Sequence, residues 1–359
     1  MILLKQMIFM ENPPPPQRGL VHGKISSEST VSERDEGNDK EISRKGPMKK
    51  ANQVYFYRRR GKYIPRVAAV HDLCGYGKCS LGVAIPVLAA AGIDVCPVPT
   101  SLFSSHTHYR PFEMLDTSSF LEKYIEAWKT IGVDLDGIYS GFLGSPDQVA
   151  IIQKLYKTYP KALRIVDPVM GDNGKKYTTY TDSLCDAMRK LCQGADLLTP
   201  NLTEASILTG LPYPGQSPKD QEIEEIILAL NTLGAKSVIL KGILREGMIT
   251  NMIAGEGIET KALTNGHLPY ALHGTGDLYA SALTAAVFAG KDLYEAATFA
   301  GRLVFNAINH TLCQPEFEDR GISFELNLKE VASLLDDCFE SEGTGDFDGY
   351  LNGNGNVSH

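Results

Sequence analysis

The stretch HGTGDLYASAL, at residues 273–283, places a glycine-rich turn directly before a run of small and apolar residues. A turn of this kind at the start of a helix presents backbone N–H groups at the positive end of the helix dipole, which suits a phosphate. Gly274 and Gly276 carry no Cβ atom, so the backbone can approach an anion closely. Asp277 follows in the first turn, where a carboxylate can accept a proton from a substrate hydroxyl. Taken alone, the stretch fits a phosphoryl-transfer centre and an ordinary glycine-rich helix cap about equally well.

Apolar runs that end in polar turns alternate with helical patterns along most of the chain. We expect strands at residues 66–70, 93–98, 137–140, 164–167, 196–199 and 236–241, with helices between them that include 81–91 and 222–233. This alternation predicts an α/β fold with a largely parallel central sheet that is covered by helices on both faces. In such sheets, ligands bind beside the loops that follow the strands.

Composition divides the chain into three parts. Residues 1–63 are rich in proline, serine and charged residues, and they hold too little apolar surface to offset the entropy of the chain, so we expect a disordered extension. Residues 64–338 are expected to form one domain. Residues 339–359 are rich in glycine, asparagine, aspartate and serine and are expected to form a flexible tail.

Charge and cysteine content narrow the class of protein. A net charge of −8 over 359 residues argues against a general nucleic-acid binder. No apolar run approaches the roughly 20 residues that cross a bilayer, so no membrane partner is expected. The seven cysteines include no Cys-x-x-Cys pair, and no secretory leader is evident. We therefore expect reduced thiols and a cytoplasmic location.

Two of the expected strands end in loops that carry oxygen ligands. The loop DPVMGDNG, residues 167–174, begins with Asp167, and the loop TPNLTE, residues 199–204, contains Asn201 and Glu204. Carboxylates bind Mg²⁺ in proteins together with phosphates and water molecules. Each loop also has a purely structural interpretation, which is an aspartate-rich turn for the first and a capping box for the second. A capping role for Asn201 and Glu204 does not exclude contact with a metal-bound water.

Two further loops lie near the start of the expected domain. HDLCGYGK, residues 71–78, follows the first strand and fits neither GxGxxG nor GxxxxGK[ST], which excludes a dinucleotide-binding motif and a P-loop there. FSSHTHY, residues 103–109, contains two histidines but no third metal ligand. A substrate-pocket or structural role is therefore favoured for the second loop over a metal site.

In this order, the segments resemble the ribokinase-like superfamily, and within it the pyridoxal/pyridoxine kinase branch. The resemblance runs from about residue 66 to about residue 312. It rests on six segments, which are HDLCGYGKCS, FSSHTHY, SGFLGS at residues 140–145, DPVMGDNGK, TPNLTEA and HGTGD. Each segment is a weak signal alone, whereas six in register are a strong one.

The resemblance implies a role for each matching residue. Asp277 would be the catalytic base, and the amides of Gly274, Thr275 and Gly276 would form the anion hole. Three residues would lie near Mg²⁺ and the nucleotide phosphates: Asp167, Asn201 and Glu204. The metal residues among them would be Asp167 and Glu204. The pocket for the vitamin B6 ring would draw on four more: Asp72, Phe103, Thr107 and Phe142. ATP is the implied donor, a monovalent cation fits the family, and the family is commonly homodimeric.

Three features depart from the better-known members of this branch. They carry Ser-His where this chain has Asp72-Leu73, and usually a tyrosine where Phe142 stands. His273 before the Gly-Thr-Gly turn is similar to the hydroxymethylpyrimidine kinase branch. That branch usually has cysteine at the position of Asp277 and a Pro-Ser-Gly-Gly first loop, which is absent here. Asp277 in place of that cysteine, together with the missing Pro-Ser-Gly-Gly loop, favours a B6 vitamer over a pyrimidine.

The implied reaction is ATP-dependent phosphorylation of the 5′-hydroxymethyl group of pyridoxal, pyridoxine or pyridoxamine, which serves vitamin B6 salvage. A kinase for hydroxymethylpyrimidine (phosphate) or for a sugar is the nearest alternative. A non-catalytic nucleotide-binding module is the alternative from another class. The Gly-Thr-Gly-Asp set argues against the module, because a protein that only binds nucleotide has no need of the Asp277 carboxylate.

Overall fold

The computed structural model describes residues 53–59, 61–317 and 321–336, all of which belong to one compact unit. Most of the extension that was predicted for residues 1–63, and all of the predicted tail at residues 339–359, lie outside the described residues. The part of the extension that is described packs on the domain. Tyr57 lies 4.8 Å from Phe288 between ring centroids, and Arg59 donates to the carbonyl oxygens of Ala91 and Gly92. The packed domain therefore begins before residue 64.

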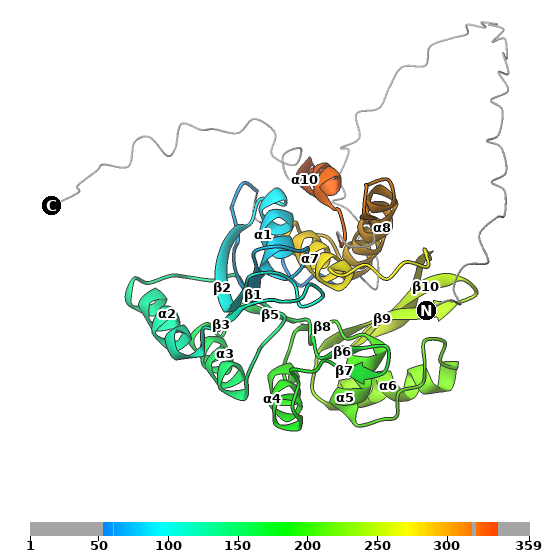
Figure 1. Ribbon diagram of the computed structural model, residues 1–359, viewed down its shortest axis with the longest axis horizontal. Coiled ribbons are helices and arrows are strands. Elements are labelled where there is room, and N and C mark those ends of the chain that lie inside the picture. Colours follow the sequence, from blue (N-terminus) through cyan, green and yellow to red (C-terminus); the bar gives the residue numbers. More distant parts are fainter. Residues whose placement is uncertain (1–52, 60, 318–320, 337–359) are drawn as a thin grey trace, which may run out of the picture. The chain divides into compact units, whose positions relative to one another are not determined.

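A nine-stranded sheet with the order β11-β10-β9-β8-β5-β4-β1-β2-β3 forms the centre of the fold (Figure 1). The bounds are β1 (Arg66–Cys74), β2 (Asp94–Phe103), β3 (Met114–Asp116), β4 (Gly137–Ser140), β5 (Leu163–Val166), β8 (Leu197–Leu198), β9 (Ser237–Arg245), β10 (Met248–Gly255) and β11 (Ile258–Gly266). The six strands from β9 to β2 pair in parallel, and the edge strands pair antiparallel. β6 (Gly171–Asp172) and β7 (Lys175–Lys176) form a separate ribbon.

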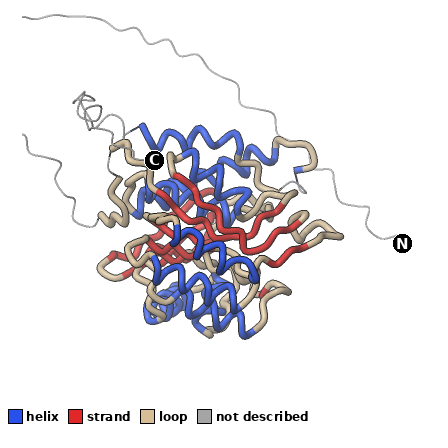
Figure 2. Tube along the Cα trace, turned by 90° about the vertical axis from the view of Figure 1, so that its left-hand side faces the viewer, coloured by secondary structure: helices blue, strands red, loops and turns tan. Residues whose placement is uncertain are grey.

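Helices cover both faces of this sheet, as the edge-on view in Figure 2 shows. One face carries α1 (Leu81–Ala90), α7 (Thr275–Phe288), α8 (Leu293–Leu312) and α10 (Leu328–Ala332). The other face carries α2 (Ser118–Thr130), α3 (Pro146–Thr158), α4 (Asp182–Cys192), α5 (Leu202–Thr209) and α6 (Asp220–Thr232). Short 3₁₀ turns flank α10 at Glu325–Asn327 and Ser333–Leu335. The predicted α/β class with a largely parallel sheet is confirmed.

The central strands are apolar on both sides because each side faces a helical layer. In β1, Ala68 and Val70 pack in the core under α2–α6, while Val67 and Ala69 pack in the core under α1, α7 and α8. Successive side chains of a strand point to opposite faces, so a strand between two helical layers reads as a continuous apolar run. All six expected strands are present, with bounds shifted by a few residues.

The edge strands β10 and β11 were not expected from the sequence. β11 has mostly exposed or half-buried side chains, and its sequence IETKALTNG is correspondingly polar. It is held by its antiparallel ladder with β10 rather than by an apolar face. Within the described ranges, no helix is both long enough and apolar enough to cross a membrane.

Candidate active site

The HGTGD stretch forms the start of α7, at the carboxyl edge of the parallel strands. Gly274 is the N-cap residue with φ of +85°, and a Cβ atom there would lie 2.0 Å from the carbonyl oxygen of Lys78. Glycine is therefore required at this position by its backbone angle and by the close approach of the loop after β1. The first N–H groups of a helix have no partner within it, so the amides of Thr275 and Gly276 are available to an anion.

Asp277 sits at the third position of α7 and is half-buried. Burial, together with the charges of Asp167 and Asp72, raises the pKa of Asp277 to about 7. The backbone N–H of Ser80 and the charge of Lys241 act in the opposite direction. A carboxylate whose pKa lies near neutrality is a competent proton acceptor at physiological pH. Asp277 therefore has the electrostatic environment of a general base.

Ser80 links Asp277 to the first loop. Its backbone hydrogen-bonds Asp277, and its hydroxyl donates to Oδ1 of Asp72 at 2.5 Å. Ser80 also has φ of +50°, a left-handed angle that is uncommon for a residue with a Cβ atom. Such backbone angles are found at functional sites, where the surrounding structure holds them in place. No motif in the sequence pointed to this contribution of Ser80.

Asp167 forms a buried ion pair with Lys241. Oδ1 of Asp167 accepts from Nζ of Lys241 at 2.6 Å and from the hydroxyl of Thr199 at 2.8 Å. Only 3% of the Asp167 side chain and 12% of the Lys241 side chain are exposed. Burial lowers the pKa of Lys241, but the charges of Asp167 and Glu204 outweigh it, so the pKa is raised overall. The ammonium group of Lys241 therefore remains charged beside the carboxylates.

Glu204 and Asn201 form the predicted capping box at the start of α5. Oδ1 of Asn201 accepts from the Glu204 amide at 2.9 Å, and Oε2 of Glu204 accepts from the Asn201 amide at 2.7 Å. Nδ2 of Asn201 donates to the carbonyl oxygen of Gly171 at 3.0 Å, which ties the two strand-end loops together. Burial, reinforced by the charge of Asp167, raises the pKa of Glu204 to about 8 against the opposing charge of Lys241.

These carboxylates suit Mg²⁺ as partners of metal-bound water. They offer the hard oxygen atoms that Mg²⁺ prefers, and they lie beside one another at the carboxyl ends of β5 and β8. Both already accept hydrogen bonds from the protein, and Lys241 contacts Asp167 directly. An ion that keeps several of its waters, as Mg²⁺ commonly does, fits this arrangement better than one that is held by protein atoms alone.

A cleft runs beside this cluster toward β10. Its lining includes residues from the two strand-end loops, the start of α5, the segment after α5, β9, β10 and the end of β11: Asp172, Asn173, Asn201, Thr203, Tyr213, Gln216, Lys241, Gly242, Leu244, Ile249 and His267. The mixture of amide, hydroxyl and apolar groups is typical of a site for a small molecule. Lys241 lines this cleft, bonds the Asp167 carboxylate and is acted on by the charge of Asp277, so it links the cleft to the start of α7.

The predicted ring-pocket residues lie on the side of β1 and β2. Asp72 and Phe103 stand at the ends of these neighbouring strands, and the rings of Phe103 and Phe142 are 6.4 Å apart. Phe103 is buried, Phe142 is half-buried and Thr107 is exposed. The carboxylate of Asp72 is directed toward Ser80 and Cys74. The structure therefore brings the rings of Phe103 and Phe142 together, whereas Thr107, in the loop after Phe103, lies on the surface.

Histidine rings join the FSSHTHY loop to the HGTGD turn. His106 stacks on His273 with ring centroids 4.5 Å apart and an angle of 12° between the planes, and His108 lies 5.7 Å from His273. The His106 amide also donates to the carbonyl oxygen of Tyr76 at 2.7 Å. These contacts give the two histidines a structural role, which is one of the roles that the sequence favoured.

Lys241 is the main functional residue that sequence reasoning missed. It follows the buried apolar run SVIL, midway along β9, and a lysine placed directly after such a run is the signal that could have identified it. Thr199 was quoted within its loop but not assigned a role, although its hydroxyl holds Asp167.

Comparison with known proteins agrees with this geometry. The chain matches the family described as phosphomethylpyrimidine kinase over residues 87–318. It is 30% identical over 258 residues to a pyridoxine/pyridoxal/pyridoxamine kinase of Bordetella avium, an alignment that covers 67% of this chain and 84% of the relative.

Solved structures show the same fold. A protein of Bacteroides thetaiotaomicron, described as a phosphomethylpyrimidine kinase and crystallised with pyridoxal, has a TM-score of 0.71 and 34% identity over 75% of this chain and 96% of its own. The pyridoxal kinase of Leishmania donovani in complex with ADP and pyridoxamine has a TM-score of 0.66, with 20% identity over 74% of this chain and 95% of its own. The second likeness concerns the fold alone. The chain belongs to the phosphomethylpyrimidine kinase family of the ribokinase-like superfamily and, within that superfamily, to the pyridoxal kinases.

Proposed function

We propose that this protein transfers the γ-phosphoryl group of ATP to the 5′-hydroxymethyl oxygen of a vitamin B6 vitamer. The observation that carries the proposal is the position of Asp277. This carboxylate has a pKa near 7 and stands in the first turn of a glycine-capped helix, within range of both the Asp167–Lys241 pair and the first loop. A phosphate donor on one side and a hydroxyl acceptor on the other would therefore meet at the Asp277 carboxylate.

The reaction follows from these positions. The ionised Asp277 accepts the proton of the substrate hydroxyl as its oxygen forms a bond to the γ-phosphorus of ATP. The bond from that phosphorus to the β–γ bridging oxygen breaks, and ADP leaves. The amides of Thr275 and Gly276, at the positive end of α7, stabilise the charge on the transferring group. Asp277 then returns its proton to solvent. Positioning and charge stabilisation carry most of the catalysis in phosphoryl transfer.

The nucleotide side is assigned to Asp167, Asn201, Glu204 and Lys241. We expect Lys241 to contact the phosphates from the cleft that it lines, while Asp167 and Glu204 hold waters of Mg²⁺. When bound, Mg²⁺ would supply neutralisation of the phosphate charge. The fold relative that holds ADP supports an adenine nucleotide as the donor. A monovalent cation near the phosphates is a further expectation from the family.

The vitamer side is assigned to Asp72, Phe103, Thr107 and Phe142. Two aromatic side chains suit the flat face of a pyridine ring, and polar groups beside them suit its substituents. The structural relative that was crystallised with pyridoxal and the pyridoxine/pyridoxal/pyridoxamine kinase relative both support a B6 vitamer. The description of the matching family keeps hydroxymethylpyrimidine as the second candidate.

We further propose that the protein is a cytoplasmic homodimer. All six cysteines in the described ranges are free thiols, which agrees with a reducing compartment. Light scattering coupled to gel filtration measures the assembly, and a single peak at the mass of one chain would contradict the dimer.

The direct test is ATP consumption by the purified full chain with one acceptor at a time: pyridoxal, pyridoxine, pyridoxamine, hydroxymethylpyrimidine or ribose. We expect the B6 vitamers to give the highest kcat/KM, and we expect the product to be the 5′-phosphate by mass. A higher kcat/KM for hydroxymethylpyrimidine would reassign the acceptor. ATP binding without turnover of any acceptor would favour a non-catalytic module.

A further inference from the structure

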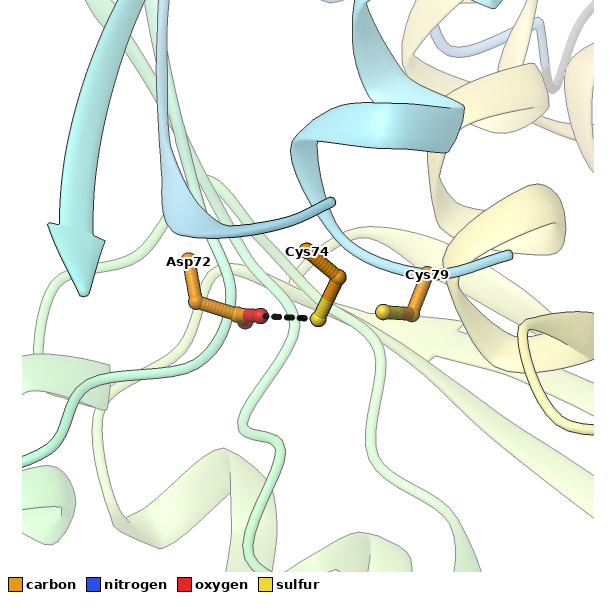
Figure 3. Close-up of side chains that lie close together, drawn as sticks. All are labelled: Asp72, Cys74 and Cys79. Carbon is orange, nitrogen blue, oxygen red and sulfur yellow. Dashed lines mark hydrogen bonds between the residues drawn. The ribbon is translucent and has the colours of Figure 1, made fainter. Parts of the chain in front are cut away.

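Two thiols and a carboxylate converge in the first loop, on the vitamer side of Asp277. Asp72 and Cys74 belong to the end of β1, and Cys79 precedes the start of α1. Their side chains point toward one another (Figure 3), and one ligand atom from each lies within 4.8 Å of the other two. In the part of the chain that the structure describes, this is the one group of three or more histidine, cysteine, aspartate or glutamate side chains that converges this closely.

The spacing of these atoms is close to that of a tetrahedral metal site. With Zn–S bonds of about 2.3 Å and Zn–O bonds of about 2.0 Å, ligand atoms on a tetrahedron stand about 3.5–3.8 Å apart. Oδ2 of Asp72 and Sγ of Cys74 are already 3.4 Å apart. The sulfur of Cys79 lies within 4.8 Å of both of these atoms. The three atoms are therefore near the separations that ligands of one shared ion have.

The ligand chemistry selects the metal. Thiolates favour zinc and other soft ions, whereas Mg²⁺ and Ca²⁺ require oxygen ligands. We propose that Asp72, Cys74 and Cys79 form a binding site for Zn²⁺ that is separate from the oxygen-rich cluster around Asp167. Three protein ligands leave a fourth position for water or for a substrate oxygen, which is the pattern of a site that exchanges its ligands rather than a closed structural site.

The surroundings of the cluster allow an ion to enter from solvent and to affect the proposed base. Cys74 is half-buried, and the next residues, Gly75 and Tyr76, are exposed, so the cluster has a route of access from solvent. Asp72 is also the partner of the Ser80 hydroxyl, and Ser80 in turn hydrogen-bonds Asp277. Zinc on Oδ2 of Asp72 would leave the Ser80 contact with Oδ1 in place, and it would add positive charge near the proposed base, on which the charge of Asp72 already acts. On the basis of the proposed function, we expect zinc to inhibit competitively against the vitamer and not against ATP.

Metal binding is measured first, because it needs no substrate. The fully reduced, metal-free full chain is titrated with Co²⁺, for which thiolate ligands produce charge-transfer absorption in the near ultraviolet. Zn²⁺ is then added to displace Co²⁺, and its affinity is measured against a chromophoric chelator. We expect one equivalent per chain and thiolate-type bands that disappear when Zn²⁺ is added.

Four variants decide whether this cluster is the site. Cys74→Ala and Cys79→Ala should each lose the thiolate bands and weaken Zn²⁺ binding by about 100-fold or more, since even residues outside the direct ligand set cost 10–100-fold. Asp72→Asn should weaken binding and keep the bands. Cys313→Ala removes an exposed thiol outside the cluster and should bind as the unaltered chain does. Thermal melting of each metal-free variant establishes that it is folded.

Absence of thiolate bands in the unaltered chain would overturn the proposal, as would bands that persist in a folded Cys74→Ala variant. Kinetic inhibition is the second measurement, and relief of zinc inhibition in Cys74→Ala is the expected result. A chain that binds zinc but turns over no vitamer would keep the metal site and reject the proposed function. A chain that turns over vitamers but shows no thiolate–metal bands would keep the proposed function and reject the metal site.

Discussion

The two sides of the candidate site are built in different ways. On the nucleotide side, the buried Asp167 carboxylate directly follows β5. It accepts hydrogen bonds from Thr199, which follows β8, and from Lys241, which lies midway along β9. On the vitamer side, the loop after β1 and the FSSHTHY loop meet through ring contacts and a few backbone hydrogen bonds, and Tyr76 is 61% exposed.

The difference indicates a division of labour. Charges that act on a developing phosphate are most effective when they are fixed in advance in a place that water does not fill, and the strand ends provide that. A pocket that must admit and release a substrate benefits from loops that can adjust, because closing and opening accompany each turnover. Asp277 stands where the two sides meet.

The largest effect is expected at Asp277. Asp277→Asn keeps the size of the side chain and removes its ability to accept a proton, so turnover should fall by about 10²–10⁴-fold. Steady-state assays with the preferred vitamer measure the rate, and calorimetry should find nearly unchanged ATP affinity. Near-normal turnover in the folded variant would remove Asp277 from the role of base.

Loss of Lys241 should destabilise the nucleotide side of the site. Lys241→Met leaves the buried Asp167 without its cation, and breaking a buried pair in this way costs about 3–5 kcal/mol of unfolding free energy. Lys154→Met is the matched control, because it breaks an exposed ion pair with Glu122 that is worth about 0–1 kcal/mol. Urea unfolding measures both variants. Equal costs for the two would mean that the Asp167–Lys241 pair does not hold the nucleotide side together.

Two glycines of the turn between the sides should respond differently. Gly274→Ala places a Cβ atom against the Lys78 carbonyl at φ of +85° and should lower stability by about 1–3 kcal/mol. Gly276→Ala meets no atom within 4 Å, lies inside the helix and should leave stability unchanged or raise it slightly. Melting temperatures compare the two. A larger loss for Gly276→Ala would contradict the close approach of the first loop.

The pH dependence of kcat/KM tests whether Asp277, which stands between the two sides, is the catalytic base. Its ionised form is the active base, so with a pKa of about 7 we expect kcat/KM to fall about tenfold for each pH unit below 7. The profile is measured from pH 5 to 9 in the unaltered chain and in Asp277→Asn. If the residual rate of Asp277→Asn still fell below pH 7, the group that titrates would belong to ATP or to the vitamer instead.

The smallest effect is expected on the vitamer side of the site. Thr107 is exposed, so Thr107→Ala should not change stability, and loss of one hydroxyl contact should raise the KM for pyridoxal by about 2–10-fold. Thr199→Ala removes a buried hydrogen bond to Asp167 and should instead lower stability. The contrast would fail if Thr107→Ala destabilised the fold or if Thr199→Ala did not.

Sequence reasoning was most successful where the signal is local. The βα alternation, the capping box of Asn201 and Glu204, and the helix that opens at Gly274 all depend on residues within a few positions of one another, and all are confirmed. The edge strands escaped notice because β11 buries little apolar surface, so its sequence lacks the pattern of a strand.

What the sequence determined by itself was the class of fold, and it also singled out the loops to which the chemistry is assigned in the proposed function. Only the tertiary structure decided which of their side chains meet. Asp167 and Lys241 are 74 residues apart, and they pair because the strand order places β8 alone between β5 and β9. Ser80 contacts Asp277 through a left-handed backbone angle that no local preference predicts. Periodicity reports which face of an element is buried, whereas contacts across the sheet depend on the order in which the strands assemble.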